Sequence, residues 1–328
     1  MNKKINVAFI YRECPSLGSG YFFTSLHNFF MNALKRNDRL SVTYFQSKEV
    51  FDATGFDENF DAIILAANQN VTGEGVPEKI IGIEKLKIPV LCNPGDVQDA
   101  LQFDPKIYHE KYKIDCYFDL FSDSWFHKFY PKEFNFRTIP IGLEPSLYQN
   151  LKPFNSRIKN KILNSGNIGR TKFTSRLYNL FMKSGYSNYD YYKLRTDCNS
   201  LPYVDYTPTL QHEYIGDKYP KLLEKYASAI AATSMAPTRK YLEIPAAGCL
   251  TFMEVTSDNH AQELGFVDNK SAIFINENNY KNKFEEFLSD PKNPKWEEIA
   301  MNGKKHALNH LTNDVGVNQL ADLIEELI

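Results

Sequence analysis

The sequence predicts an α/β protein built from two successive doubly wound units. Short apolar runs alternate with longer segments of helical spacing, and several of the runs are apolar on both faces. Parallel strands that are covered by helices on each side have this pattern. The alternation restarts after a joint at residues 140–153 that holds several prolines and a glycine. The 328 residues are enough for two domains of ordinary size.

The first unit is expected to be a Rossmann-like domain over residues 1–150. The segment 22–34 has the apolar spacing of a helix between the first two strands. Because strands that alternate with helices need crossover connections, the sheet is expected to be parallel. Its strands are expected at residues 5–11, 40–46, 61–67, 88–93, 115–120 and 137–142.

The second unit is expected to be another Rossmann-like domain, over residues 151–314. The last segment, 315–328, has an apolar helical stripe that must be buried, and it is expected to pack back on the first domain. Strands are expected at residues 161–165, 190–194, 228–232, 250–255 and 272–275, and helices at residues 173–182, 219–226, 238–246, 280–288 and 296–311.

Composition and charge restrict the class of protein. The chain is 43% hydrophobic and 24% charged, which is typical of a globular protein. A net charge of -2 makes nucleic acid an unlikely main partner. The five cysteines lack the spacing of a disulfide framework or a zinc site, and this favours a reducing, cytoplasmic location. No signal peptide and no long apolar run precede or interrupt the strands, so no transmembrane segment is expected, while peripheral membrane contact stays open.

In each unit a glycine-containing loop follows the first expected strand. In the first unit Gly18, Ser19 and Gly20 form a candidate phosphate loop or acceptor-side loop, because glycine lets backbone amides approach a ligand. Phe23 stands where a third glycine would complete a dinucleotide fingerprint, so nicotinamide binding is rejected. An ordinary loop with flexible glycines is the alternative.

The second unit opens with Gly166 and Asn167 after a strand, followed by Arg170 and Arg176. Arginine matches phosphate geometry in a bidentate way, so backbone amides and a guanidinium at this position are expected to hold a diphosphate. Arg170 is expected to be the more important arginine because it stands closer to the strand. Surface arginines are the alternative.

The segment 238–250 contains the densest group of candidate residues. Thr238 is expected to cap a helix, and Glu243 lies within that helix among apolar neighbours. A carboxylate there needs either a partner or hydroxyl groups to accept from, because an unpaired buried charge is costly. A solvated helix-surface glutamate is the alternative. The candidate nucleotide-binding residues of this segment are Thr238, Arg239, Lys240, Tyr241 and Glu243.

Candidates for acid–base catalysis lie in the first unit. Asp96 and Asp99 follow the end of a strand and are candidates for a general base toward an acceptor hydroxyl, with a turn and helix cap as the alternative. His127 is a similar candidate. His306 and His310 lie one helical turn apart but have no third ligand nearby, and no strand ends in an Asp-x-Asp pair. No metal site is therefore expected.

From about residue 161 onward the sequence resembles the CgeB-like (spore-maturation) branch of the group 1 glycosyltransferases. The pieces are loose but occur in order, and Tyr241 stands where phenylalanine is usual. No acidic residue stands seven positions after Glu243, where Leu250 is found, so the two-glutamate pattern of the wider superfamily is incomplete. The pieces are Ser165-Gly166-Asn167 with Arg170 and Arg176, Gly216-Asp217-Lys218-Tyr219 with Leu222-Leu223 and Ala229-Ile230, residues 239–250, Glu263-Leu264-Gly265-Phe266 with Phe274, and Ile299-Ala300 with Gly303, His310 and Thr312.

The resemblance implies a GT-B fold, in which two Rossmann-like domains face a central cleft. It implies a metal-independent, hexosyltransferase-type enzyme of carbohydrate biosynthesis, with no cofactor and with a nucleotide-diphosphate sugar as co-substrate. The second domain is expected to hold the nucleotide sugar, and the first is expected to hold a glycan or other hydroxyl acceptor. The alternatives are a non-catalytic nucleotide-sugar-binding protein and an epimerase-type enzyme of the same fold. A DNA glycosyltransferase is disfavoured by the charge.

Overall fold

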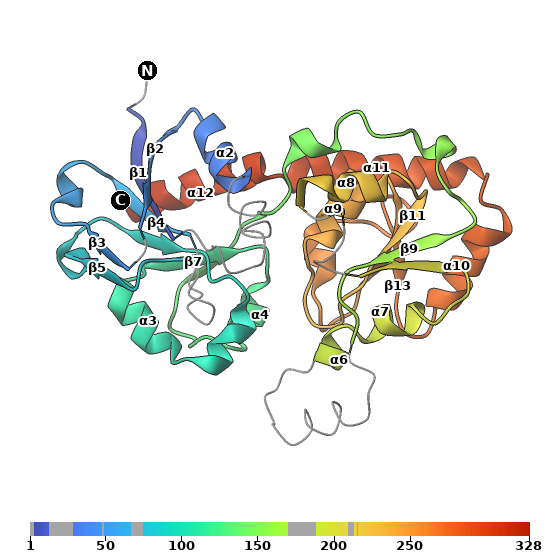
Figure 1. The fold of residues 1–328 in the computed structure, drawn as a ribbon, viewed down its shortest axis with the longest axis horizontal. Coiled ribbons are helices and arrows are strands. Elements are labelled where there is room, and N and C mark those ends of the chain that lie inside the picture. The colour runs from blue at the N-terminus through green and yellow to red at the C-terminus, as the bar shows by residue number, and fades with distance from the viewer. Residues whose placement is uncertain are drawn as a thin grey trace. The chain divides into compact units, whose positions relative to one another are not determined.

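The computed structural model describes residues 3–12, 29–47, 49–66, 75–169, 188–208, 213–214 and 216–328. The chain forms two compact units (Figure 1). Unit 1 comprises Met1–Ile141 and Asn313–Ile328, and unit 2 comprises Gly142–Thr312. Among the described residues, no helix combines the length and the apolar character that crossing a membrane requires.

Unit 1 contains a six-stranded parallel sheet in the order β2-β1-β4-β6-β7-β8. Each of the six expected strands has a counterpart, although the strand expected at residues 137–142 already ends at Thr138. Two further short strands, β3 (Val50–Asp52) and β5 (Lys79–Ile81), form a separate parallel pair that the sequence did not indicate. The six strands are β1 (Ile5–Tyr11), β2 (Leu40–Gln46), β4 (Ala62–Leu65), β6 (Val90–Cys92), β7 (Cys116–Asp119) and β8 (Phe136–Thr138).

The helices of unit 1 are mostly short. Of the expected helix 22–34, residues 22–28 lie outside the described part of the chain, and the remainder is seen as α2. The α-helices are α2 (Phe29–Arg36), α3 (Pro105–Tyr112), α4 (Asp123–Phe126) and α12 (Asn313–Leu327), and the 3-10 turns are η2 (Phe56–Glu58), η3 (Ile83–Lys85) and η4 (Val97–Gln102).

The last helix, α12, packs into the core of unit 1, beside α2 (Figure 1). Leu320 and Ile324 are fully buried in the same cluster as β1 and α2. At Gly316 the helix touches the backbone so closely that a Cβ would lie 1.9 Å from the Pro140 carbonyl oxygen. Any side chain at Gly316 would therefore push the helix out of this core.

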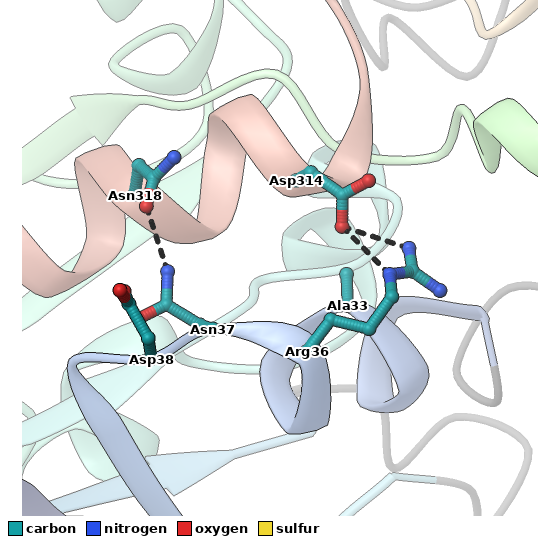
Figure 2. Close-up of a pocket in the computed structure, with 6 residues that line it drawn as sticks. All are labelled: Ala33, Arg36, Asn37, Asp38, Asp314 and Asn318. Carbon is teal, nitrogen blue, oxygen red and sulfur yellow. Dashed lines mark hydrogen bonds and ion pairs between the residues drawn. The ribbon is translucent and has the colours of Figure 1, made fainter.

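A shallow hollow between α2 and α12 is shown in Figure 2. Arg36 pairs with Asp314 at 2.8 Å on one side of it, and Asn37 donates to Asn318 at 2.7 Å on the other. These polar side chains already bind one another across the two helices. The hollow is therefore not a candidate site. Its lining residues are Ala33, Arg36, Asn37, Asp38, Asp314 and Asn318.

Unit 2 contains a five-stranded parallel sheet in the order β10-β9-β11-β12-β13. The direction of strand progression reverses between β9 and β11, because β10 lies on one side of them and β12 and β13 on the other. The strands are β9 (Ile162–Ser165), β10 (Val204–Thr207), β11 (Ser228–Ala231), β12 (Leu250–Glu254) and β13 (Ile273–Ile275).

One expected strand is wrong: residues 190–194 fall in two short helices, α6 (Asn188–Tyr191) and α7 (Lys193–Cys198). Leu194 and Cys198 are fully buried in the core of unit 2 and are four residues apart, which is the helical period. The aromatic residues of this segment favour a strand by their type. The helical spacing of Leu194 and Cys198 outweighs that preference. The strand that pairs with β9 is instead β10.

The remaining helices of unit 2 agree with the expected ones, except that residues 173–182 lie outside the described part of the chain. The α-helices are α8 (Tyr219–Leu223), α9 (Lys240–Ala246), α10 (Tyr280–Ser289) and α11 (Pro294–His310), and the 3-10 turns are η5 (Pro145–Tyr148), η6 (Phe154–Ser156), η7 (Gly216–Lys218) and η8 (Ala261–Leu264).

Candidate functional site

The candidate site lies at the carboxyl ends of β9 and β11, where the strand order of unit 2 reverses. In parallel α/β sheets, ligands bind in the crevice outside the carboxyl ends at this point. The chain leaves β9 through Gly166, whose φ of 105° is a left-handed conformation that favours glycine. It leaves β11 through residues 232–239 and then enters α9. This carboxyl edge of the sheet, called the crevice below, is therefore bordered by one glycine turn and one helix start.

Lys240 lies directly over Gly166. A Cβ added to the glycine would be 2.5 Å from Lys240 Cε and 3.1 Å from Lys240 Nζ. The ammonium lies 4.6 Å from the centre of the Tyr219 ring, whose hydroxyl is hydrogen-bonded to Ser165 Oγ at 2.7 Å. A cation over an aromatic face is favourable, so the ring helps to hold the amine in place. Glycine is required at 166 for both its backbone angle and this close approach.

The charge of Lys240 responds to its surroundings. Its pKa is lowered to about 8, mainly by burial and also by the Arg195 and Arg239 guanidinium groups, whereas the Glu243 carboxylate opposes this shift. Lys240, Arg195 and Arg239 thus lie near the Glu243 carboxylate, and a second carboxylate, Glu254, interacts with Arg195. An excess of positive charge at a crevice of this kind suits an anionic ligand.

Glu243 lies one helical turn after Lys240 in α9 and is half-buried. Burial raises the pKa of its carboxyl group, while Lys240, Arg239 and a hydrogen bond from the Tyr148 hydroxyl lower it. The alternative of a solvated helix-surface glutamate is therefore wrong. The carboxylate keeps acceptor capacity beyond the bond from Tyr148, because two carboxylate oxygens offer about four lone-pair positions.

Arg239 and Thr238 precede α9. The stem of Arg239 packs over Gly142, where a Cβ would lie 2.3 Å from Arg239 Cδ. The expected cap by Thr238 is wrong: the helix N-cap is Arg239, which makes no side-chain cap bond. The Thr238 hydroxyl is instead buried without a hydrogen-bond partner. Its expected role in nucleotide binding stays a prediction.

Tyr241 lies beneath the crevice and does not line it. The ring is fully buried, and its hydroxyl accepts from the Thr233 amide at 3.0 Å and donates to the Glu254 carbonyl oxygen at 3.1 Å. Asn259 donates to the same carbonyl at 2.8 Å. Tyr241 therefore fixes the segment between β11 and α9, and its hydroxyl is already engaged.

Arg195 is a residue of the crevice that the sequence analysis missed. It comes from α7, and its side chain reaches the carbonyl oxygens of Ala232 at 3.0 Å and Asn167 at 2.9 Å. The strand expected at residues 190–194 would not bring it to this edge. The four-residue spacing of Leu194 and Cys198 was the signal for a helix.

The other expected phosphate ligands are only partly described. Asn167 is exposed, and the Gly166 amide donates to the Thr207 carbonyl at 3.0 Å, so this amide already has a partner. The remaining residues lie outside the described part of the chain, and their roles stay predictions: Gly18, Ser19, Gly20, Arg170 and Arg176.

The acid–base candidates lie in unit 1. Asp96 is exposed and Asp99 is half-buried in the turn η4 after β6. Burial raises the pKa of Asp99 to about 6, and the nearby Asp96 charge adds to the shift. His127 is shielded, with Nδ1 2.9 Å from the Pro131 carbonyl and Nε2 3.3 Å from Asp123. Asp99 is therefore the better placed candidate, because both ring nitrogens of His127 have partners.

Metal ligands do not cluster in the described residues, where no group of three or more His, Cys, Asp and Glu side chains could hold an ion. Of the paired histidines on α11, His306 has its Nε2 2.8 Å from the Leu264 carbonyl and its ring against Phe266. These contacts give His306 a role in packing.

Comparison with known proteins shows the fold. No protein-family model and no curated protein matches the sequence. A glycosyltransferase from Rickettsia africae aligns over 99% of both chains at 10% identity, with a TM-score of 0.58. Anabaena HepE in complex with UDP-glucose aligns over 98% of this chain and 100% of its own at 12% identity, with a TM-score of 0.55. Sucrose-phosphate synthase from Thermosynechococcus elongatus aligns over 99% of both chains at 10% identity, with a TM-score of 0.52. These neighbours have two Rossmann-like domains, and the chain has the GT-B fold.

Proposed function

We propose that the protein transfers a sugar from a nucleoside-diphosphate donor to an acceptor hydroxyl, without a metal ion. The observation that carries this proposal is the cationic crevice at the strand reversal of unit 2, where Lys240, Arg239 and Arg195 lie near one carboxylate, Glu243. A diphosphate would supply negative charge to balance these cations. The fold supports the proposal, because HepE of the same fold was crystallised with UDP-glucose.

Each residue of the crevice has a proposed part. Lys240 and, outside the described residues, Arg170 bind the diphosphate, while Glu243 accepts hydrogen bonds from ribose hydroxyls. With several positive groups on the diphosphate, the donor needs no divalent cation to offset its charge. The resemblance of the chain from about residue 161 onward to the CgeB-like glycosyltransferases supports this assignment, and we place the acceptor in unit 1.

In the reaction, the acceptor oxygen bonds to the anomeric carbon while the bond from that carbon to the β-phosphate oxygen breaks. The electron pair of that bond leaves with the nucleoside diphosphate, whose growing charge the cations stabilise. The acceptor hydroxyl proton passes to Asp99, which must be ionised to receive it. A pKa near 6 leaves Asp99 ionised at neutral pH and basic enough to take the proton.

The test is a thermal-unfolding screen of nucleoside diphosphates and nucleotide sugars on the full chain and on Lys240→Met. A ligand at about 100 times its Kd stabilises the folded state by about 2.7 kcal/mol, so the correct donor raises Tm for the wild type only. Product analysis with hydroxyl acceptors follows. Donor binding without any turnover supports the non-catalytic alternative, and conversion of the donor without acceptor supports the epimerase. Absence of any nucleotide binding overturns the proposal.

A further inference from the structure

Arg195 is a buried cation with one unused nitrogen. Its side chain is 1% exposed, although arginine is almost never fully buried unless paired. Nε donates to the Ala232 carbonyl and Nη1 donates to the Asn167 carbonyl, while the buried Nη2 has no hydrogen-bond partner. The guanidinium carbon lies 4.9 Å from the centre of the Tyr192 ring.

The hydrogen-bond partners of Arg195 in the described chain are neutral carbonyls, and the buried Glu254 carboxylate, whose pKa Arg195 lowers, interacts with it only through space. Burying an ion away from water is costly unless a well-placed counter-charge offsets it, and a buried donor without an acceptor adds to that cost. The fold keeps this cation by fixing two of its nitrogens on backbone carbonyls. The unused nitrogen therefore marks a position where an anion would supply the missing acceptor together with a negative charge in direct contact.

The position of Arg195 coincides with the strand reversal of unit 2. Its two carbonyl partners, Asn167 and Ala232, follow β9 and β11, the two strands on either side of the reversal. A Cβ on Gly166 would lie 3.1 Å from Arg195 Nη1 and equally far from Lys240 Nζ. Two cations thus approach one backbone position that has no side chain.

We propose that Arg195 binds the diphosphate of the donor through Nη2, together with Lys240. The identity of the ligand rests on the function proposed above, whereas the anion site itself rests on the geometry of Arg195. A guanidinium that is held by two carbonyls cannot relax on ligand binding, so it is pre-organised for a phosphate oxygen. Because charge grows on the departing diphosphate, the residue acts on kcat as well as on binding.

The chain offers a matched control in the next residue. Thr196 lies on the same helix and its Oγ1 accepts from the Gly169 amide at 2.6 Å, so it holds the same loop after β9 without carrying charge. Thr196→Val keeps the shape and removes this bond. If Arg195 only held this loop in place, the substitutions at 195 and 196 would change ligand affinity to the same degree.

The experiment measures binding of inorganic pyrophosphate, a nucleoside diphosphate and the uncharged nucleoside by calorimetry, on the full chain and on three variants. Arg195→Gln is expected to weaken pyrophosphate and nucleoside diphosphate at least tenfold and to leave nucleoside affinity unchanged. Arg195→Lys, which keeps the charge and loses the planar fork, is expected to weaken them several-fold and to retain more kcat than Arg195→Gln. Thr196→Val is expected to stay within about threefold of the wild type.

The outcomes separate the site from the function. Wild-type binding of pyrophosphate that is lost in Arg195→Gln, without binding of any nucleotide, upholds the anion site and defeats the donor proposal. Nucleotide and pyrophosphate binding that is unchanged in both Arg195 variants defeats the role of Arg195 and leaves the function standing. Equal losses of pyrophosphate affinity in Thr196→Val and Arg195→Gln, together with loss of nucleoside binding, also overturn the role of Arg195. If Arg195→Gln does not fold, as judged by circular dichroism, Arg195→Lys decides.

Discussion

At the scale of single residues, Lys240 is a crevice cation whose protonation changes near neutral pH. Its pKa of about 8 means that the ammonium form dominates at pH 7 and is lost as the pH rises above 8. We expect the Kd of the donor diphosphate to be about tenfold weaker at pH 9 than at pH 7, because one pKa unit corresponds to a tenfold change in protonation. Calorimetric titrations across this range measure it.

The control for Lys240 is Lys240→Arg, which stays charged over the whole range because the guanidinium pKa is above 12. Its donor affinity should not change between pH 7 and pH 9, whatever its absolute value. A wild-type affinity that is equally flat would show that the Lys240 ammonium does not contact the diphosphate.

Glu243 provides a second residue-scale prediction. Glu243→Gln should weaken nucleoside binding by roughly tenfold or more, since a hydrogen bond to a charged group contributes about 1.5–3 kcal/mol. The effect should appear with the uncharged nucleoside, because the ribose hydroxyls are the proposed partners. Glu263→Gln is the matched control, as Glu263 is exposed and pairs with His260. Unchanged nucleoside affinity in Glu243→Gln would remove the ribose role.

Residue patterns located part of the site and missed the rest for a physical reason. Lys240 and Glu243 are three positions apart in one helix, so a local pattern is enough to place them on the same face. Arg195 comes to the crevice from another helix through contacts with residues 167 and 232, and no local pattern records such long-range contacts. Thr238 was expected as a cap from its type alone, but the backbone at Arg239 starts the helix.

At the scale of elements, the turn from β9 into the crevice depends on Gly166. Gly166→Ala combines a φ that side chains avoid with contacts of 2.5–3.1 Å to Lys240 and Arg195. We expect the free energy of unfolding to fall by about 1–3 kcal/mol and pyrophosphate binding to be lost, because both cations must move. Chemical denaturation and calorimetry measure the two effects.

Gly55→Ala is the control for backbone strain alone. Gly55 also has a positive φ, 78°, but nothing lies within 4 Å of its added Cβ. That variant should lose stability to a similar degree and should bind pyrophosphate like the wild type. Retained pyrophosphate binding in Gly166→Ala would show that the two cations do not need the open space over the glycine.

Elements were predictable where periodicity was strong. The strands over residues 5–11 and 40–46 are seen as β1 and β2 with the expected bounds. β1 is an almost continuous buried apolar run, whereas the edge strand β2 alternates exposed and less exposed residues over its first five positions. The sequence does not indicate β10, because it is an edge strand of only four half-buried residues, three of which have polar side chains. The three-residue strands β3 and β5 are too short to show any period.

At the scale of the whole molecule, the two units should respond to mutation separately. Leu320 of α12 is fully buried in unit 1, so Leu320→Ala should lower the stability of that unit by about 2–5 kcal/mol. Hydrogen exchange should increase in β1 and β2 and stay unchanged in β9 and β11. Leu327→Ala, at a position that is 38% exposed, serves as the control. Equal acceleration in both sheets would mean that the units unfold as one.

The position of α12 has a consequence for biosynthesis. As the chain leaves the ribosome, β1 to β8 emerge first, yet their core still lacks the helix that carries Leu320 and Ile324. Every residue of unit 2 is already present when residue 312 has been made. The second half of the chain can therefore complete its folding before the first half does. The nascent first half must wait with an uncovered apolar surface, which makes it the natural client of ribosome-associated chaperones.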